Sequence, residues 1–94
     1  MRVVYLRSAA RDLLWLRSYY ERVFPEGAET ARQAIRRMEA LVADNPYIGR
    51  PTHRSEARRL RIMRTPFFVL YRPTAERIEI LRVIDGRSSD GTLD

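Results

Sequence analysis

The sequence predicts a two-layer α+β domain with the element order β-α-α-β-β-β. Two stretches in the first half carry apolar residues every three or four positions, the spacing of an amphipathic helix. The second half holds three short runs of Ile, Leu, Val and Phe that are separated by prolines, as antiparallel strands are. A helical hairpin has to cover a sheet face, and 94 residues suit a single domain spanning residues 1–94.

The first strand and the first helix are predicted from residues 3–24. Residues 3–6 form a short β-prone run, and Ser8 is expected to cap the following helix because its hydroxyl can accept a free amide of the first turn. The helix is expected over residues 9–24. Its core-facing stripe comprises Ala9, Leu13, Leu16, Tyr20 and Val23.

The second helix follows a break at Pro25-Glu26-Gly27 and is expected to end at Asn45-Pro46, since a residue before proline avoids the helical region. Residues 47–57 have no usable period and are predicted to form a loop. The two helices are expected to pack as a hairpin. The apolar face of the second helix comprises Ala31, Ala34, Ile35, Met38, Leu41 and Val42.

Three antiparallel strands are predicted over residues 59–64, 67–72 and 77–84. Alternation in the first of them places its arginines on the face opposite the core, whereas the second is apolar on both sides and is predicted to lie in the centre of the sheet. Residues 87–94 are mostly polar and are expected to be a flexible tail.

The charge is strongly one-sided. All 18 basic residues are arginine, and residues 50–72 hold seven of them against the single acid Glu56, so this stretch carries the whole net charge of +6. A local basic field attracts nucleic acid or an acidic peptide. The alternative is a solvated face that serves solubility.

Several function classes are disfavoured. The absence of cysteine excludes disulfides, thiolate zinc sites and thiol nucleophiles, and one histidine among scattered acids predicts no metal site. A chain this small has little room for a cofactor cavity, and no glycine-rich phosphate loop is present. The apolar runs are too short to cross a bilayer. We therefore expect a cytoplasmic protein without cofactor, metal or membrane contact.

An ordered set of motifs resembles the RelE/ParE toxin superfamily of bacterial toxin–antitoxin modules. The set comprises Asn45-Pro46-Tyr47-Ile48-Gly49-Arg50-Pro51 and residues 59–62, 67–72 and 78–87, and the resemblance covers nearly the whole chain. It implies a toxin that binds a cognate antitoxin in a hetero-oligomer. The acidic, otherwise disordered C-terminal segment of that antitoxin would wrap the toxin, docking a helix on the helical hairpin or a strand on the sheet edge.

The antitoxin-binding residues are expected to be Leu14, Trp15 and Tyr19, because they add more apolar surface than one packed stripe needs. The alternative is that Trp15 and Tyr19 pack beneath residues 45–57.

The resemblance leaves two activities open. RelE-like toxins are ribosome-dependent endoribonucleases that cut messenger RNA, whereas ParE-like toxins inhibit DNA gyrase without a nuclease site. RNA cleavage needs a base, an acid and cations, which the RelE-like branch supplies with lysine, arginine, glutamate, histidine and a C-terminal tyrosine. This chain has no lysine, Asp85 stands where a histidine often precedes Gly-Arg, and neither tyrosine nor histidine follows. We therefore expect a ParE-like toxin that is not an enzyme.

On the ParE-like interpretation, the target-binding residues are the arginines of the sheet face and of its last corner, namely Arg59, Arg61, Arg64, Arg82 and Arg87. A ribonuclease would instead have to cluster Arg61, Tyr71 and Arg82 on the sheet, with His53 and Glu56 supplying a base and an acid.

The structural alternatives are a packed Tyr71, an Arg82 paired with Glu79 or Glu56, and an exposed His53. A third function is a non-catalytic module that binds nucleic acid through the arginine face.

Overall fold

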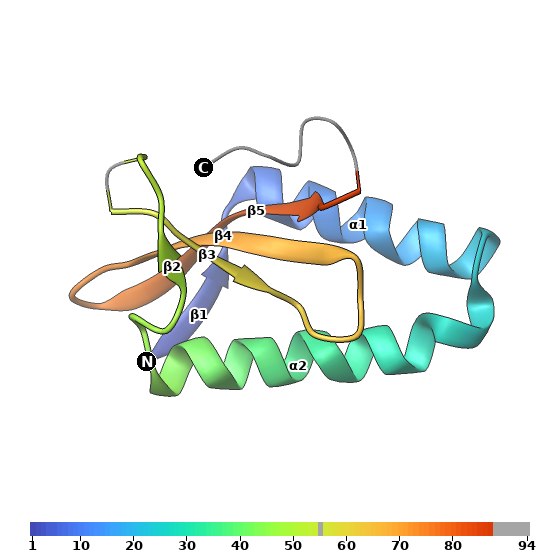
Figure 1. Ribbon diagram of the computed structural model, residues 1–94, viewed down its shortest axis with the longest axis horizontal. Coiled ribbons are helices and arrows are strands. Elements are labelled where there is room, and N and C mark those ends of the chain that lie inside the picture. The colour runs from blue at the N-terminus through green and yellow to red at the C-terminus, as the bar shows by residue number, and fades with distance from the viewer. Residues whose placement is uncertain (55, 88–94) are drawn as a thin grey trace.

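The computed structural model describes residues 1–54 and 56–87. Two helices and a short 3₁₀ helix follow the first strand, and four more strands complete one mixed sheet (Figure 1). The element order predicted from the sequence is confirmed, with one additional short strand. The elements are β1 (Arg2–Tyr5), α1 (Arg7–Arg22), η1 (Pro25–Gly27), α2 (Ala28–Asp44), β2 (Arg50–Pro51), β3 (Arg58–Arg61), β4 (Phe67–Pro73) and β5 (Arg77–Asp85).

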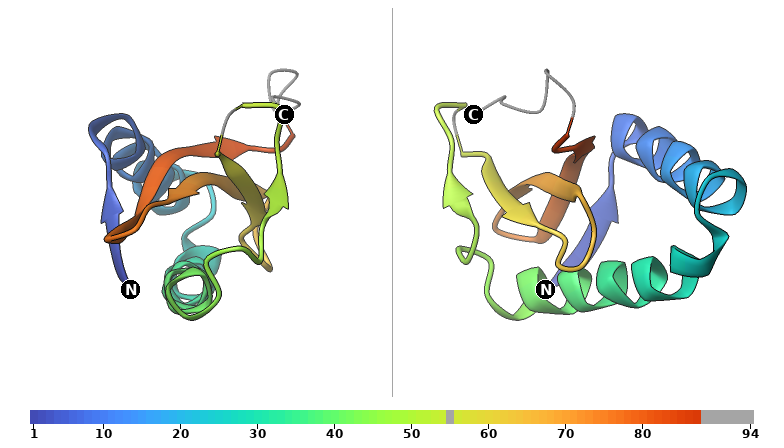
Figure 2. Two further views of the ribbon diagram at one scale, coloured as in Figure 1. Left: turned by 90° about the vertical axis from the view of Figure 1, so that its left-hand side faces the viewer. Right: turned by 45° about the vertical axis from the view of Figure 1, so that its right-hand side comes forward.

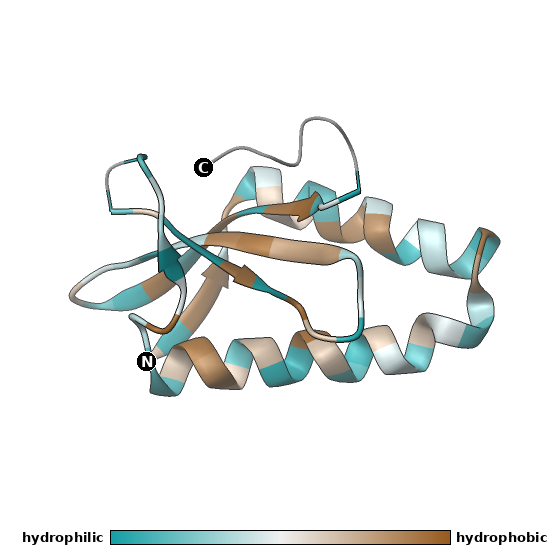
Figure 3. Ribbon diagram, in the orientation of Figure 1, coloured by the Kyte–Doolittle hydropathy of each residue, from teal (hydrophilic) through white to brown (hydrophobic). Residues whose placement is uncertain are grey.

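The five strands lie in the order β1-β5-β4-β3-β2. β1 pairs with β5 in parallel, and the other neighbours are antiparallel. β4 is central, as its continuous apolar run predicts, and most of it is coloured hydrophobic in Figure 3. A register shift between Leu70 and Tyr71 interrupts the β4–β5 ladder.

The core lies between one face of the sheet and the two helices. The helices leave η1 in different directions and open toward the strands (Figure 2). Each helix contributes small and large apolar side chains to one cluster with Val69, Tyr71 and Ile80 of the sheet. A hydrogen bond of 2.6 Å from Tyr5 of β1 to Glu39 of α2 ties the second helix to the first strand.

The start of α1 differs from the prediction. The helix begins at Arg7, Leu6 takes the N-cap position without a side-chain cap, and Ser8 already lies in the first turn. Leu6 still donates to Ile80 O at 3.0 Å while its own carbonyl accepts from Ala10 N at 2.9 Å. The chain thus passes from sheet to helix at a single residue, and no separate capping residue fits between them.

The predicted apolar stripes of the two helices are mostly correct, but each contains one exposed residue near the C-terminal end of its helix. Val23 follows the last helical residue and is 63% exposed, and Leu41 is 39% exposed. The remaining residues of both stripes are buried or packed against the core.

The segment predicted as one loop contains β2, which pairs with β3 through Arg50 and Arg59. β3 itself ends at Arg61, three residues earlier than expected, because Arg64 adopts a positive φ of 69° and turns the chain. The buried Thr65 hydroxyl then closes this turn by donating to Ile62 O at 2.8 Å and accepting from Phe67 N at 3.1 Å.

Ordered contacts continue one residue into the segment that was predicted to be a flexible tail. Gly86 N donates to Pro66 O at 2.8 Å, and Arg87 is bonded to Asp85, so Arg87 does not belong to a free tail. The rest of the predicted tail, residues 88–94, lies outside the described residues. Within the described ranges, no helix is long and apolar enough to cross a membrane.

Candidate functional site

The sheet face opposite the helices carries two of the three arginines of β3, Arg59 and Arg61. Strand register places Arg59 beside Leu70 and Arg61 beside Phe68, whereas their neighbour Leu60 lies beside Val69 on the core side. Alternation in β3 therefore sorts its side chains as the sequence predicts. Leu60 packs against the core on one side of β3, and the side chains of Arg59 and Arg61 lie on the other side.

Three of the predicted target-binding residues meet around one cavity of about 310 Å³, here called the arginine pocket. Two come from β3, and the third follows β5, so the pocket forms only when the two strands flank β4. The lining residues are Arg59, Arg61, Pro66, Phe67, Phe68, Gly86 and Arg87.

The floor of the pocket is aromatic and its rim is cationic. The guanidinium carbon of Arg59 lies 4.2 Å from the ring centroid of the buried Phe68, a cation–π distance that holds the arginine against the sheet. The Arg61 side chain is exposed and forms no hydrogen bond or ion pair with any described residue.

Gly86 closes one end of the pocket through close backbone approach. A Cβ at this position would lie 3.0 Å from Pro66 O and 3.5 Å from the Phe68 ring. The hydrogen bond from Gly86 N to Pro66 O needs this approach, and it fixes where Arg87 leaves the sheet. The glycine thus positions the third arginine.

Arg87 is held on two sides. Its guanidinium forms a bidentate ion pair with Asp85, with Nε–Oδ1 and Nη2–Oδ2 distances of 3.0 Å, and it lies 5.4 Å from the ring centroid of Tyr19. The hydrogen bonds from Arg87 lower the pKa of Asp85, so the pair stays ionised at neutral pH.

Arg64 lies elsewhere. It lines a second groove of about 290 Å³ between α2 and the β3–β4 turn, together with Arg61 and Arg37. The floor of this groove is apolar and includes Met38 and Leu60. Arg61 therefore stands between the two hollows.

Arg82 is held at the edge of the sheet. β1 accompanies β5 only as far as Ile80, and Asp12 of α1 covers the edge beyond it. The Asp12 carboxylate accepts from Arg82 Nε at 2.8 Å, from Arg82 Nη2 at 3.1 Å and from Val83 N at 2.8 Å. The expected partners Glu79 and Glu56 were wrong, because the nearest acid comes from the helix.

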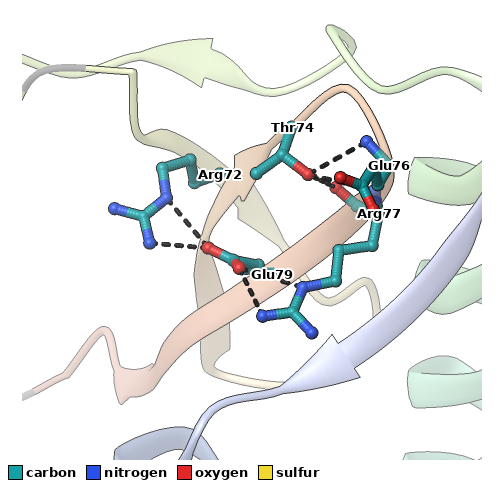
Figure 4. A network of polar contacts seen from close by, with 5 residues as sticks. All are labelled: Arg72, Thr74, Glu76, Arg77 and Glu79. Atoms are coloured by element: carbon teal, nitrogen blue, oxygen red, sulfur yellow. Dashed lines mark hydrogen bonds and ion pairs between the residues drawn. The ribbon is translucent and has the colours of Figure 1, made fainter.

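Glu79 is the shared acid of a different cluster. It accepts from Arg72 and Arg77, with shortest distances of 2.6 and 2.7 Å (Figure 4). Hydrogen bonds from Arg72 and then from Arg77 lower its pKa. Arg72 belongs to the basic stretch, whose single acid is Glu56. Strand pairing gives Arg72 an acidic partner, Glu79, from outside that stretch.

The predicted antitoxin-binding residues gather on α1. Leu14 and Trp15 are 65% and 53% exposed. The Trp15 ring stacks on Tyr19 at 5.7 Å between centroids and meets the edge of Phe67 at 6.0 Å, rather than packing beneath residues 45–57. These three rings, here called the aromatic cluster, adjoin the arginine pocket through Phe67 and Arg87.

Tyr71 has a structural environment. It is fully buried on the helix side of the sheet, where its hydroxyl donates to Pro46 O at 2.9 Å and accepts from Gly49 N at 2.8 Å. Burial raises the pKa of Tyr71, although the Gly49 N–H and Arg58 oppose this effect. Arg58 fastens the same segment by donating to Tyr47 O at 3.1 Å and Gly49 O at 2.7 Å.

The residues considered for RNA cleavage do not converge. Arg61 is on the arginine face, Tyr71 is on the core face, Arg82 is bound at the sheet edge, and His53 is exposed in the segment between β2 and β3. Across residues 1–54 and 56–87, no three His, Cys, Asp or Glu side chains are grouped as a metal would need.

Three contributors were missed by sequence reasoning, namely Asp12, Arg58 and Gly86. Asp12 is an acid off the apolar stripe of a helix, and no local pattern shows that it meets a strand 70 residues away. Gly86 carried a usable signal, because a glycine directly after a strand often marks close backbone approach.

Comparison with known proteins agrees with the fold. The family model described as ParE toxin of type II toxin-antitoxin system, parDE, matches residues 3–89. A solved structure, the chromosomal ParDE TA system from P. aeruginosa, is similar with a TM-score of 0.73 and 31% identity, covering 90% of this chain and 95% of that chain. No curated protein matches the sequence.

Proposed function

The chain belongs to the ParE toxin family of type II toxin–antitoxin systems, and from this premise we propose that it inhibits DNA gyrase by protein binding and is neutralised by a cognate antitoxin. The observation that carries the proposal is the arginine pocket, which brings Arg59, Arg61 and Arg87 together on the sheet face opposite the helices. Gyrase and the antitoxin are cytoplasmic partners in this proposal, and the toxin acts without cofactor.

The aromatic cluster supports the antitoxin part of the proposal. Trp15 offers a large half-exposed ring beside the exposed Leu14, and aromatic side chains of this kind are common anchors in protein interfaces. An amphipathic helix from the antitoxin would cover this surface, and acidic residues on its flank would face Arg87. Target and antitoxin would then compete at Arg87.

The placement of the residues supports binding rather than RNA cleavage. The Tyr71 hydroxyl already has a donor and an acceptor partner, and the Arg82 guanidinium is occupied by Asp12. Neither side chain faces the arginine pocket, so a scissile phosphate bound there would find no tyrosine or histidine among the described pocket residues. The arrangement of the described residues therefore supports binding over the endoribonuclease alternative.

Expression of the toxin without antitoxin tests the proposal. We expect an SOS response and gyrase-dependent double-strand breaks, while ribosome-bound transcripts remain intact. A gyrase variant that resists other gyrase poisons, assayed in parallel, controls for indirect DNA damage. Codon-dependent transcript cleavage with no DNA breaks would contradict the proposal and favour the endoribonuclease alternative.

Antitoxin docking is tested by dissociation kinetics. Leu14→Ala and Trp15→Ala should accelerate dissociation of the antitoxin at least tenfold, because buried apolar contacts act mainly on the off-rate. Raising the salt concentration should slow association instead, since rim charges steer encounter. Ala10→Ser, on the same helix at another exposed position, is the control variant. Unchanged dissociation of both apolar variants would exclude α1 as the docking surface.

A further inference from the structure

Among the described residues, the arginine pocket has more guanidinium N–H groups than carboxylate partners that face them. Asp85 occupies two of the N–H groups of Arg87, and the Tyr19 hydroxyl, at 3.4 Å, takes a third. A guanidinium has five such groups, so two N–H groups of Arg87 have no partner among residues 1–54 and 56–87. All five N–H groups of the Arg61 guanidinium lack a partner among the described residues. The pocket is therefore built to receive an anion.

The chemistry of the pocket favours a phosphate group over a peptide segment. A bound peptide strand needs free backbone groups at a sheet edge, but Arg59 is paired with Arg50 on one side and with Leu70 on the other. What the pocket offers is side-chain N–H groups above aromatic rings. Guanidinium forks match the geometry of phosphate oxygens, and several on one face suit a chain of phosphates.

The surroundings extend the pocket into a cationic track. Arg61 also borders the neighbouring groove, where Arg37 and Arg64 continue the positive rim. Arg64 lies in the turn after β3 and Arg37 lies on α2, so the positive rim continues from the sheet to the helix. A polyanion can follow this track, whereas a single small anion needs only one end of it.

We propose that the arginine pocket binds phosphodiester groups of the DNA backbone, so that the toxin holds DNA and gyrase together. The second half of this statement rests on the proposed function. The toxin then recognises gyrase loaded with DNA in preference to gyrase alone. Arg61 contacts a phosphate of the DNA backbone and does not contact the base edges, so binding does not depend on DNA sequence.

Direct DNA binding by the full-length toxin tests the inference independently of gyrase. The probe is a fluorescein-labelled 20-base-pair duplex, followed by anisotropy at several salt concentrations. We expect Arg61→Ala to weaken binding about fivefold or more and to reduce the slope of log K against log salt by about one. Arg36→Ala, which removes an exposed arginine from α2, is the matched control and should change neither quantity.

Two competitors distinguish the sources of negative charge. Unlabelled duplex should displace the probe, whereas inorganic phosphate at equal phosphate concentration should not. A glutamate-rich peptide that binds more tightly than DNA, with the same dependence on Arg61, would overturn the inference in favour of an acidic protein partner. Equal losses for Arg61→Ala and Arg36→Ala would overturn it too, because binding would then reflect total charge.

A gyrase supercoiling assay tests the proposed function separately from the phosphate site. A toxin that binds DNA through Arg61 but leaves gyrase supercoiling unaffected would refute the proposed function and leave the phosphate site standing. A toxin that inhibits gyrase equally well with Arg61→Ala, and whose Arg61→Ala variant binds duplex as the wild type does, would refute only the phosphate site.

Discussion

The edge of β5 and the arginine pocket use the same side chain for different purposes. At the edge, Arg82 is locked by Asp12, which also accepts the N–H of Val83 where β1 no longer reaches. In the pocket, Arg61 meets no described acid and stays exposed. The difference comes from the neighbouring element. At the edge, α1 supplies a carboxylate that binds the arginine as part of the fold. On the face of the arginine pocket, no described helix covers the sheet, so the arginine is available to a partner.

Removing the carboxylate at the edge should have the largest effect on stability. Asp12→Ala leaves Val83 N–H and the Arg82 guanidinium without their acceptor, and we expect the free energy of unfolding to fall by about 2–3 kcal/mol. Asp12→Asn keeps one acceptor oxygen and should lose about half as much. Chemical denaturation measures both. Asp44→Ala, at the exposed end of α2, is the control and should stay within about 0.5 kcal/mol of the wild type.

Equal destabilisation by Asp12→Ala and Asp44→Ala would show that the edge needs no cap. The contrast between the two regions would then disappear.

Removing the Tyr71 hydroxyl should cause the second-largest loss of stability. Tyr71→Phe removes one partner from Gly49 N–H and one from Pro46 O in a buried position, which should cost about 1–2 kcal/mol. Tyr47→Phe is the matched control, since Tyr47 is 70% exposed and the same substitution there should be nearly neutral. Chemical denaturation measures both variants, and the midpoint of Tyr71→Phe should lie below that of Tyr47→Phe. Coincident midpoints would mean that the segment before β2 is held by Arg58 rather than by Tyr71.

Local sequence patterns predicted the elements well and their partners poorly. The central position of β4 and the outward arginines of β3 follow from periodicity alone, which acts over a few residues. The Asp12–Arg82 pair joins α1 to β5, so its formation depends on where β1 stops pairing. No pattern within either element contains that information.

The same limit explains the arginine pocket. The sequence singled out Arg59, Arg61, Arg64, Arg82 and Arg87 for their charge, and the fold separates these five into three places. Alternation could assign a face to Arg59 and Arg61. It could not show that Gly86 would bring Arg87 beside them, because this depends on a hydrogen bond to Pro66 across the sheet.

Acid should weaken the cluster around Glu79. Arg72 and Arg77 hold the pKa of this carboxyl below its ordinary value of 4.5, so its protonated form is disfavoured in the folded protein. Its contribution to stability is therefore fully present above that ordinary value and is lost as the pH falls through the lowered folded value. Glu79→Gln should flatten the stability profile below about pH 4.5 and leave the slope near pH 7 unchanged.

Glu76→Gln, at an exposed position in the β4–β5 turn, controls for the general loss of negative charge. Parallel acid profiles for the two variants would place the acid sensitivity elsewhere, with Asp85 as the next group to examine.

Arg61 of the arginine pocket should give the smallest change in stability and the largest change in toxicity. Arg61→Ala removes a side chain without described polar partners, so the unfolding free energy should shift by less than about 0.5 kcal/mol. Growth arrest should nevertheless be lost, because the proposed target contact goes with it. Arg36→Ala removes the same charge from α2 and should leave both melting and growth arrest unchanged.

Antitoxin binding should persist in each variant, since Leu14 and Trp15 are intact, and this shows that the fold is retained. If Arg61→Ala remained fully toxic with normal melting, the exposed arginine would serve solubility, and the target-binding surface would have to be sought on the helices, where the aromatic cluster is the next candidate.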